Sequence, residues 1–300
     1  MKIKNILIPV DFSEFSDRAV EHGLMLAKKF GADIKLLHAV VLFQQEPDEK
    51  EHMDLYEKYV QRKEESGFKR LQEKMDAAGG GPHVRIESEM VRSISAAEAI
   101  LEYVGQHPCD LVIIGTHGER GLRRLVFGSV AERVVRLSPV PVLTVQKGLR
   151  QDSIARIVVP VDFSAHATVA VKSARVLAKT YNAAISFVHV INQQLHPAYG
   201  AANVNSVFVL DPDLKDRSLK NLIGFAGKEA EDDDFRVLEG RPSVEIVNFA
   251  RDERADLILM GTKGLSGLDH LLIGSVTERV VRTSPVPVLT VGREASLTDN

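Results

Sequence analysis

The sequence has few of the features that mark secreted, membrane-spanning or nucleic-acid-binding proteins. It holds one cysteine, Cys109, which cannot form an internal disulfide and therefore suits a reducing cytoplasm. No apolar run approaches the roughly 20 residues that cross a bilayer, and residues 1–10 lack the apolar core and cleavage site of a secretory signal. The formal net charge of -3 does not favour nucleic-acid binding. We therefore expect a cytoplasmic protein with no membrane insertion and no nucleic-acid partner.

Several well-known site motifs are absent as well. There is no Gly-x-x-x-x-Gly-Lys loop and no Gly-x-Gly-x-x-Gly segment, so neither P-loop nor dinucleotide chemistry is indicated. The histidines show no spacing typical of zinc ligands. His38 and His189 recur at equivalent strand ends, where we expect a packing role, with metal binding or catalysis as the alternative. Cys109 stands at the start of a predicted strand and is expected to be an inert, packed thiol.

What the sequence does contain is a long internal repeat. Its 300 residues are about twice the common size of a domain, and 44% hydrophobic with 26% charged residues is typical of a globular chain. Three segments recur in order, 6–13 at 157–164, 110–118 at 256–264, and 138–145, without change, at 284–291. We therefore predict a tandem duplication with domains at 1–147 and 154–293, joined by a polar linker at 148–153.

Each copy alternates predicted strands with predicted helices. In the first copy we expect strands at 5–10, 34–41, 84–90, 109–115 and 140–145, and helices at 14–30, 50–78, 95–107 and 129–137. Continuous aliphatic strands between helices indicate a doubly wound α/β fold, with a parallel sheet covered on both faces. Ligands of such sheets bind beyond the carboxyl ends of the strands, and the first and fourth strands lead to Asp11 and Gly115.

A glycine pattern follows the fourth strand of each copy. Gly115 and Gly118 precede nine residues and then Gly128-Ser129, and the second copy repeats this spacing at 261–275. Glycines let the main chain approach an anion closely. Each Gly-Ser pair also begins a Ser-x-x-Glu capping box, so a helix with free N–H groups should start there. The same residues could serve only as turns and caps, but their repetition in both copies favours a nucleotide site.

Together with the early Pro-Val-Asp and the late Ser-Pro-Val-Pro-Val segments, this pattern resembles the universal stress protein family over essentially the whole chain. The resemblance implies two Rossmann-like domains, similar to the adenine nucleotide alpha hydrolases, each with a five-stranded parallel sheet in the order 3-2-1-4-5. It implies ATP as the cofactor, alone or with Mg2+ or Mn2+. It assigns nucleotide binding to Pro9, Val10, Asp11, Ala39, Gly115, Gly118, Gly128, Ser129, Val130, Pro160, Val161, Asp162, Val190, Gly261, Gly264, Gly274, Ser275 and Val276. The positive charge of Arg120, between the glycines, adds this residue to the candidate nucleotide-binding set.

The two copies differ in the residues between their glycines. The first has Arg120, Arg123 and Arg124, and the second has Ser266, Asp269 and His270. If this loop faces the phosphates, the three guanidinium groups should make the first site bind ATP more tightly. One difference counts against the first site. The second copy has the family's Gly-Arg-Pro turn at 240–242, whereas the first copy has Ile-Ser-Ala at 94–96.

The expected function is a regulatory module in which bound nucleotide biases conformation or the choice of a signalling partner, because no second acidic residue repeats near Asp11 or Asp162 to support rapid hydrolysis. Two alternatives stay open. One is a slow ATPase or a nucleotidyl- or phosphotransfer enzyme, and the other is a scaffold with one or both sites empty. We assign no catalytic residue and no metal ligand.

The predicted last strands indicate how domains could assemble. Two prolines in Ser-Pro-Val-Pro suit an edge strand, and edge strands pair readily. The resemblance implies dimerisation through this strand, so residues 140–145 are expected to pack against 286–291 within one chain. The whole chain is expected to form a homodimer. The long segment 192–211 is either a lid over the second site or a disordered insertion.

Overall fold

The chain divides into two compact units, Lys2–Leu149 and Arg150–Asn300, which we call the first and second unit. The computed structural model describes residues 3–42, 50–78, 84–116, 128–148, 152–192, 206–229, 233–264 and 273–292. Both units have the doubly wound α/β fold that the strand and helix pattern predicts. Among the described residues, no helix has the length and apolar character needed to span a membrane.

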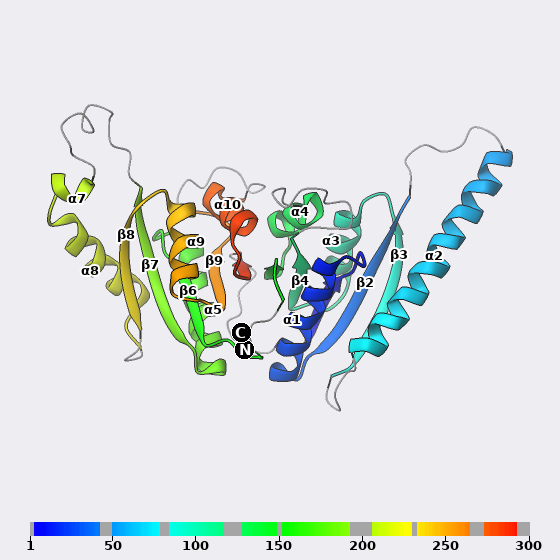
Figure 1. The fold of residues 1–300 in the computed structure, drawn as a ribbon, viewed down its shortest axis with the longest axis horizontal. Coiled ribbons are helices and arrows are strands. Elements are labelled where there is room, and N and C mark those ends of the chain that lie inside the picture. Colours follow the sequence, from blue (N-terminus) through cyan, green and yellow to red (C-terminus); the bar gives the residue numbers. More distant parts are fainter. Residues whose placement is uncertain are drawn as a thin grey trace. The chain divides into compact units, whose positions relative to one another are not determined.

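The first unit is a parallel five-stranded sheet covered on both faces by helices (Figure 1). The strand order is β3-β2-β1-β4-β5, as the family resemblance implies. Helices α1 and α2 pack on one face, and α3 and α4 pack on the other. The elements are β1 Asn5–Pro9, α1 Glu14–Phe30, β2 Asp33–Val41, α2 Lys50–Ala78, β3 Ile86–Ser93, α3 Ala96–Gln106, β4 Leu111–Gly115, α4 Ser129–Leu137 and β5 Val142–Val145.

The second unit repeats this topology. Its strands follow the order β8-β7-β6-β9-β10, with all described pairs parallel. Helices α5 and α8 cover one face of the sheet, and α9 and α10 cover the other. The elements are β6 Arg156–Pro160, α5 Ala165–Tyr181, β7 Ala184–Asn192, α7 Val207–Leu210, α8 Leu214–Ala226, β8 Asp234–Gly240, α9 Pro242–Asp252, β9 Leu257–Gly261, α10 Ser275–Thr283 and β10 Val288–Val291.

The first helix of each unit begins and ends through the same two devices. Ser13 caps α1 by accepting a hydrogen bond from the Ser16 N–H, and Ser164 caps α5 in the same way. The predicted stop at Gly31 is confirmed, because this residue has the left-handed φ of 65° that glycine adopts at little cost. Asn182 takes the same place after α5, with φ 54°.

Three strands of the first unit differ from the prediction by two residues or more, and β4 is one of them, because it begins at Leu111 and not at 109. β3 runs from Ile86 to Ser93, and the expected 84–90 was therefore placed too early. β5 begins at Val142, so the prolines expected within this strand precede it. The reason is that proline has no N–H group to donate to the hydrogen-bond ladder. Part of the segment 192–211 lies outside the described residues, and its end forms the short helix α7.

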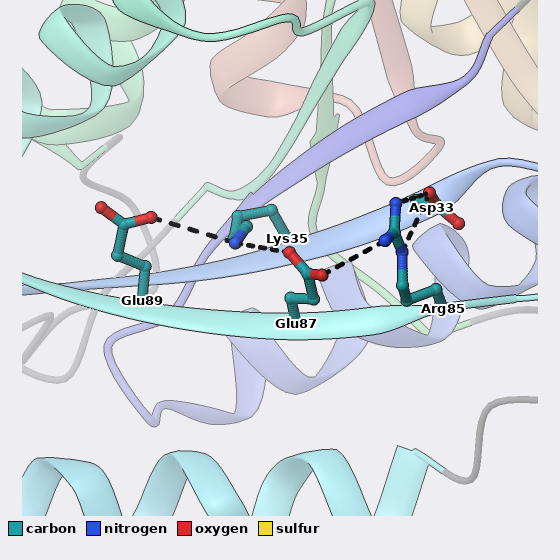
Figure 2. Close-up of polar contacts among 5 residues, drawn as sticks. All are labelled: Asp33, Lys35, Arg85, Glu87 and Glu89. Atoms are coloured by element: carbon teal, nitrogen blue, oxygen red, sulfur yellow. Dashed lines mark hydrogen bonds and ion pairs between the residues drawn. The ribbon is translucent and has the colours of Figure 1, made fainter.

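Strand β3 is the outer strand of the first unit, and charged side chains join it to β2 (Figure 2). Lys35 donates to Glu87 over 2.8 Å and lies 3.9 Å from Glu89. Arg85 contacts Asp33 over 2.7 Å and Glu87 over 3.6 Å. Exposed ion pairs of this kind contribute about 1 kcal/mol or less each. The charges discourage an outer strand from pairing with a foreign strand, so we assign them to protection of this edge.

A buried ion pair holds the second unit together on one side of its sheet. Arg175 of α5 contacts both carboxylate oxygens of Asp233 over 2.6 Å, and its guanidinium lies 4.7 Å from the centre of the Phe187 ring. The Asp233 side chain is only 2% exposed. It also accepts a hydrogen bond from the Glu229 N–H. The acidic run 232–234 predicts, from sequence alone, a solvated turn. For Asp233 this prediction is wrong, because its side chain is buried and Arg175 compensates its charge.

We expect Asp233→Ala to destabilise the second unit by about 3–5 kcal/mol, since it leaves the Arg175 charge buried without its partner. The matched control is Asp234→Ala, because Asp234 is a half-buried neighbour that pairs with exposed Arg236 and should change stability by about 0.5 kcal/mol or less. Urea unfolding of the full chain followed by circular dichroism measures both. Equal effects of the two substitutions would show that the buried pair is not a stabilising contact.

Burial of Cys109 raises the pKa of its thiol to about 11. The thiolate is the reactive form, so the native protein at pH 8 should react with iodoacetamide about a hundredfold more slowly than the urea-unfolded chain. The native rate should climb with pH up to about 11, whereas the unfolded rate should level off at lower pH. Comparable native and unfolded rates at pH 8 would contradict the packed position of this thiol.

Candidate functional site

The carboxyl ends of the two central strands meet at one edge of each sheet. β1 pairs with β4 in parallel, and β6 pairs with β9 in the same way, so each pair of strands ends side by side. β1 and β6 lead into residues 11–13 and 162–164, which we call the Asp-Phe-Ser turns. β4 and β9 lead into residues 115–128 and 261–274, which we call the glycine loops. These two segments form the candidate site in each unit.

The Asp-Phe-Ser turn fixes one oxygen of its carboxylate. Asp11 Oδ1 accepts hydrogen bonds from the Ser13 N–H over 3.0 Å and from the Ser13 hydroxyl over 2.6 Å. Asp162 Oδ1 accepts from the Ser164 N–H, also over 3.0 Å. The same two serines cap the helices that follow. The carboxylate is therefore oriented by the start of a helix, which leaves Oδ2 as the oxygen turned away from these bonds.

Each glycine loop closes on itself through one main-chain hydrogen bond. The Gly128 N–H donates to the Thr116 carbonyl over 2.8 Å, and the Gly274 N–H donates to the Thr262 carbonyl over the same distance. The threonine N–H groups in turn donate to Val145 and to the last residue of β10. The chain thus leaves the strand end and returns to it. The predicted residues Gly118 and Arg120, and the arginines at 123 and 124, lie outside the described residues.

The helices after the loops start where the sequence predicts, but their cap is different. The N-cap residues are Gly128 and Gly274, whose carbonyls accept from the Glu132 and Glu278 N–H groups over 2.9 Å. The prediction that Ser129 and Ser275 form capping boxes was therefore wrong. Each serine is the first helical residue and is exposed. A glycine cap offers no side chain, so the N-cap residue itself places no side-chain hydrogen bond on the first-turn N–H groups.

The glycines of the pattern have different tasks. A Cβ added at Gly115 would lie 2.8 Å from the main chain of Phe15, and one at Gly261 would lie 2.7 Å from the His166 Cβ. These two glycines let the first turn of α1 or α5 pack on the strand end. A Cβ at Gly264 would lie 2.6 Å from Asp162 Oδ2. This second glycine therefore brings the glycine loop up to the carboxylate.

The remaining predicted residues divide into core and edge positions. Val10 and Val161 are each 3% exposed, so their side chains belong to the core and only their peptide groups face the turn. The others are half-buried at the carboxyl edge: Pro9, Ala39, Val130, Pro160, Val190 and Val276. Among the described residues, no group of three or more His, Cys, Asp or Glu side chains could hold a metal ion.

Sequence reasoning missed how the middle residue of the turn is held. Phe12 and Phe163 have φ 65° and 64°, in the left-handed region. His38 and His189 contact their rings with centroids 4.5 and 4.6 Å apart, which agrees with the packing role expected of both histidines. The signal that was available is the phenylalanine that follows the aspartate in both copies, although a sequence does not show φ.

The Asp-Phe-Ser turns of the two units have different neighbours. The Arg70 guanidinium lies 4.1 Å from the centre of the Phe12 ring, and Lys74 forms an ion pair with Asp17. Burial lowers the pKa of Lys74, and the negative charge of Asp11 opposes this shift. In the second unit, Phe225 instead packs edge-on against Phe163 at 5.5 Å. The two sites therefore differ in charge next to a shared turn.

Comparison with known proteins supports one family for both units. The model of the universal stress protein family matches residues 2–146 and 153–292. A universal stress protein of Methanocaldococcus jannaschii is 35% identical over 156 residues, which cover 47% of this chain and 96% of that protein. One from Synechocystis is 26% identical over 310 residues, which cover 96% of this chain and 99% of that protein.

Solved structures show the same fold over both halves. The crystal structure of a universal stress protein from Archaeoglobus fulgidus aligns with a TM-score of 0.68 and 24% sequence identity, covering 98% of this chain and 100% of that chain. A universal stress protein structure from Pseudomonas aeruginosa aligns with a TM-score of 0.64 and 16% identity. At these identities the likeness concerns the fold. With the two matches of the family model, the chain belongs to the universal stress protein family, as a tandem member with one family domain in each half.

Proposed function

We propose that each domain binds an adenine nucleotide, with ATP as the ligand, and that its occupancy biases conformation or the choice of a signalling partner. The observation that carries this proposal is the glycine-capped start of α4 and α10 beside the Asp-Phe-Ser turn. A helix start that is capped by glycine attracts an anion, because its first N–H groups can donate to it. The carboxylate next to it is a hydrogen-bond acceptor, which suits the amino and hydroxyl groups of adenosine.

The phosphate end of the nucleotide would lie at the helix start. The N–H groups of the first turn, at 129–131 and 275–277, would donate to phosphate oxygens, and the exposed hydroxyls of Ser129 and Ser275 are within the same turn. Closure of the glycine loop by the 2.8 Å bond keeps this turn at the strand end. A glycine cap suits this use, because a capping side chain would occupy the same N–H groups.

The adenosine end would lie at the Asp-Phe-Ser turn. Asp11 and Asp162 would accept hydrogen bonds from the adenine amino group or the ribose hydroxyls through Oδ2. The half-buried apolar edge formed by Pro9 with Ala39, and by Pro160 with Val190, provides a surface for the base. A Cβ at Gly264 would lie 2.6 Å from Asp162 Oδ2, so a glycine is needed where the loop comes this close to the carboxylate.

A metal would depend on the nucleotide. The described residues hold no ready cluster of metal ligands, so Mg2+ or Mn2+ would be bound chiefly through phosphate oxygens. In the sequence, no second acidic residue repeats near Asp11 or Asp162, and this favours a binding module over an enzyme. Incubation of the purified protein with ATP separates the alternatives, because rapid turnover supports a nucleotide-dependent enzyme and absence of binding supports a scaffold.

The ranking of the two sites stays a prediction. The three arginines at 120, 123 and 124 favour tighter binding in the first domain, provided that their loop faces the phosphates. The basic groups Arg70 and Lys74 near the first turn add to this difference in charge. Pairing of the two domains through their last strands and assembly of the chain into a homodimer also stay predictions, as does a place in the cytoplasm.

Replacement of the cap glycine by aspartate should remove nucleotide binding from one site and keep the fold. In Gly274→Asp, the new carboxylate would cap the first-turn N–H groups and repel phosphate, so affinity at the second site should fall at least about tenfold. Gly128→Asp should do the same at the first site. Isothermal titration with ATP should give two sites in the wild type and one in each variant.

The control for this experiment is Gly224→Ala, at an exposed glycine of α8 where an added Cβ meets nothing within 4 Å. It should leave both sites intact. Circular dichroism verifies that the aspartate variants remain folded, as expected because aspartate is a favourable cap. Two unchanged ATP sites in folded Gly128→Asp and Gly274→Asp proteins would contradict the proposal, and so would a wild type that binds no ATP.

A further inference from the structure

The Asp-Phe-Ser turn contains an unfavourable main-chain conformation in both units. Phe12 and Phe163 have φ 65° and 64°, a region that a bulky side chain adopts only when its surroundings impose it. Such residues cluster at ligand-binding segments. Because the conformation is unfavourable in both units, contacts with neighbouring side chains must hold each phenylalanine in it.

A histidine from the second strand provides the same two contacts in each unit. The His38 ring lies 4.5 Å from the Phe12 ring, tilted by 44°, and its Nδ1 lies 2.7 Å from the Val10 carbonyl oxygen. The His189 ring lies 4.6 Å from the Phe163 ring, tilted by 46°, with its Nδ1 2.8 Å from the Val161 carbonyl oxygen. Because a carbonyl only accepts, Nδ1 donates the proton in both.

These contacts flank the aspartate on both sides. The histidine holds the carbonyl of the residue before the aspartate and the ring of the residue after it. The aspartate between them is left with Oδ1 bound to the following serine. In the second unit, Oδ2 faces the glycine loop at Gly264. The histidine therefore contacts the residues on both sides of the aspartate, while the serine at the helix start holds its Oδ1.

The other neighbour of each phenylalanine is not repeated. The Arg70 guanidinium lies 4.1 Å from the Phe12 ring, whereas Phe225 packs edge-on against the Phe163 ring at 5.5 Å. The contact on this side of the ring is therefore a cation in the first unit and an aromatic ring in the second. The histidine contacts, by contrast, are nearly the same in both units. The ring–ring and Nδ1–carbonyl distances each differ by 0.1 Å between the units, and the angle between the ring planes differs by 2°.

We propose that His38 and His189 are positioning residues for nucleotide binding. Each holds the strained phenylalanine and the carbonyl before the aspartate, and so presents Asp11 or Asp162 to the adenosine part of the ligand. The inference rests on the proposed function, because its consequence is a change in nucleotide affinity. It adds to that function a residue whose side chain controls affinity through the aspartate and not by contact with the nucleotide.

The test uses the full chain with its second site closed by Gly274→Asp, so that ATP titration reports the first site. His38→Asn keeps an N–H donor near the Val10 carbonyl but removes the ring from Phe12. The matched control is His107→Asn, since the His107 ring stacks on Tyr103 at 4.1 Å and its Nδ1 lies 3.1 Å from the Tyr103 carbonyl oxygen, on a helix end outside the candidate site.

His38→Asn should weaken ATP binding about tenfold, because the carboxylate loses its fixed direction, and His107→Asn should leave affinity unchanged. The loss should shrink to about twofold or less in an Asp11→Asn background, since a positioning residue acts through that carboxylate. Equal affinities of His38→Asn and its parent would overturn the proposal. An undiminished tenfold loss in the Asp11→Asn background would overturn it as well.

A second measurement keeps the inference separate from the proposed function. Hydrogen exchange of the Ser13 N–H, which donates to Asp11 Oδ1, needs no ligand. It should be at least about tenfold faster in His38→Asn and unchanged in His107→Asn, whereas exchange of the Val112 N–H in the sheet should be unchanged in both. Unchanged Ser13 exchange would overturn the positioning role. Absence of ATP binding with faster Ser13 exchange would overturn only the proposed function.

Discussion

One main-chain hydrogen bond in each domain keeps the parts of the candidate site together. It runs from the N–H of the cap glycine, Gly128 or Gly274, to the carbonyl of the threonine that follows the fourth strand of the domain, over 2.8 Å. The bond returns the chain to the strand end after the glycine loop. The next helix must then begin at the carboxyl edge of the sheet, next to the Asp-Phe-Ser turn.

The two domains agree at this edge and differ away from it. The Asp-Phe-Ser turn, its histidine, the loop closure and the glycine cap are repeated with nearly the same distances. Elsewhere the domains differ in helix length and in buried contacts. The helix before the third strand has 29 residues in the first domain and 13 in the second. The buried Arg175–Asp233 pair belongs to the second domain, and in the first domain Leu24 stands at the position of the arginine. The repeated part is the part that a shared ligand would require.

The fold could be predicted from the sequence because it follows from patterns that are local or repeated. Aliphatic runs alternate with helical stripes, and Gly31 ends its helix as expected. The glycine spacing also located the edge at which the candidate site lies. Ser-x-x-Glu predicted where a helix begins, but not that a glycine caps it, because the choice of cap depends on where the loop rejoins the strand end. The burial of Val10 and the packing of Gly115 against Phe15 are likewise tertiary facts.

The central claim is that the glycine-capped helix starts receive the phosphates of ATP in both domains. Its most direct test is the change in backbone amide chemical shifts when the isotope-labelled full chain is titrated with ATP. The account predicts that the amides of 128–131 and 274–277 shift most, as nuclei next to a newly bound anion should. Large shifts confined to other parts of the chain, with these two helix starts unchanged, would contradict it.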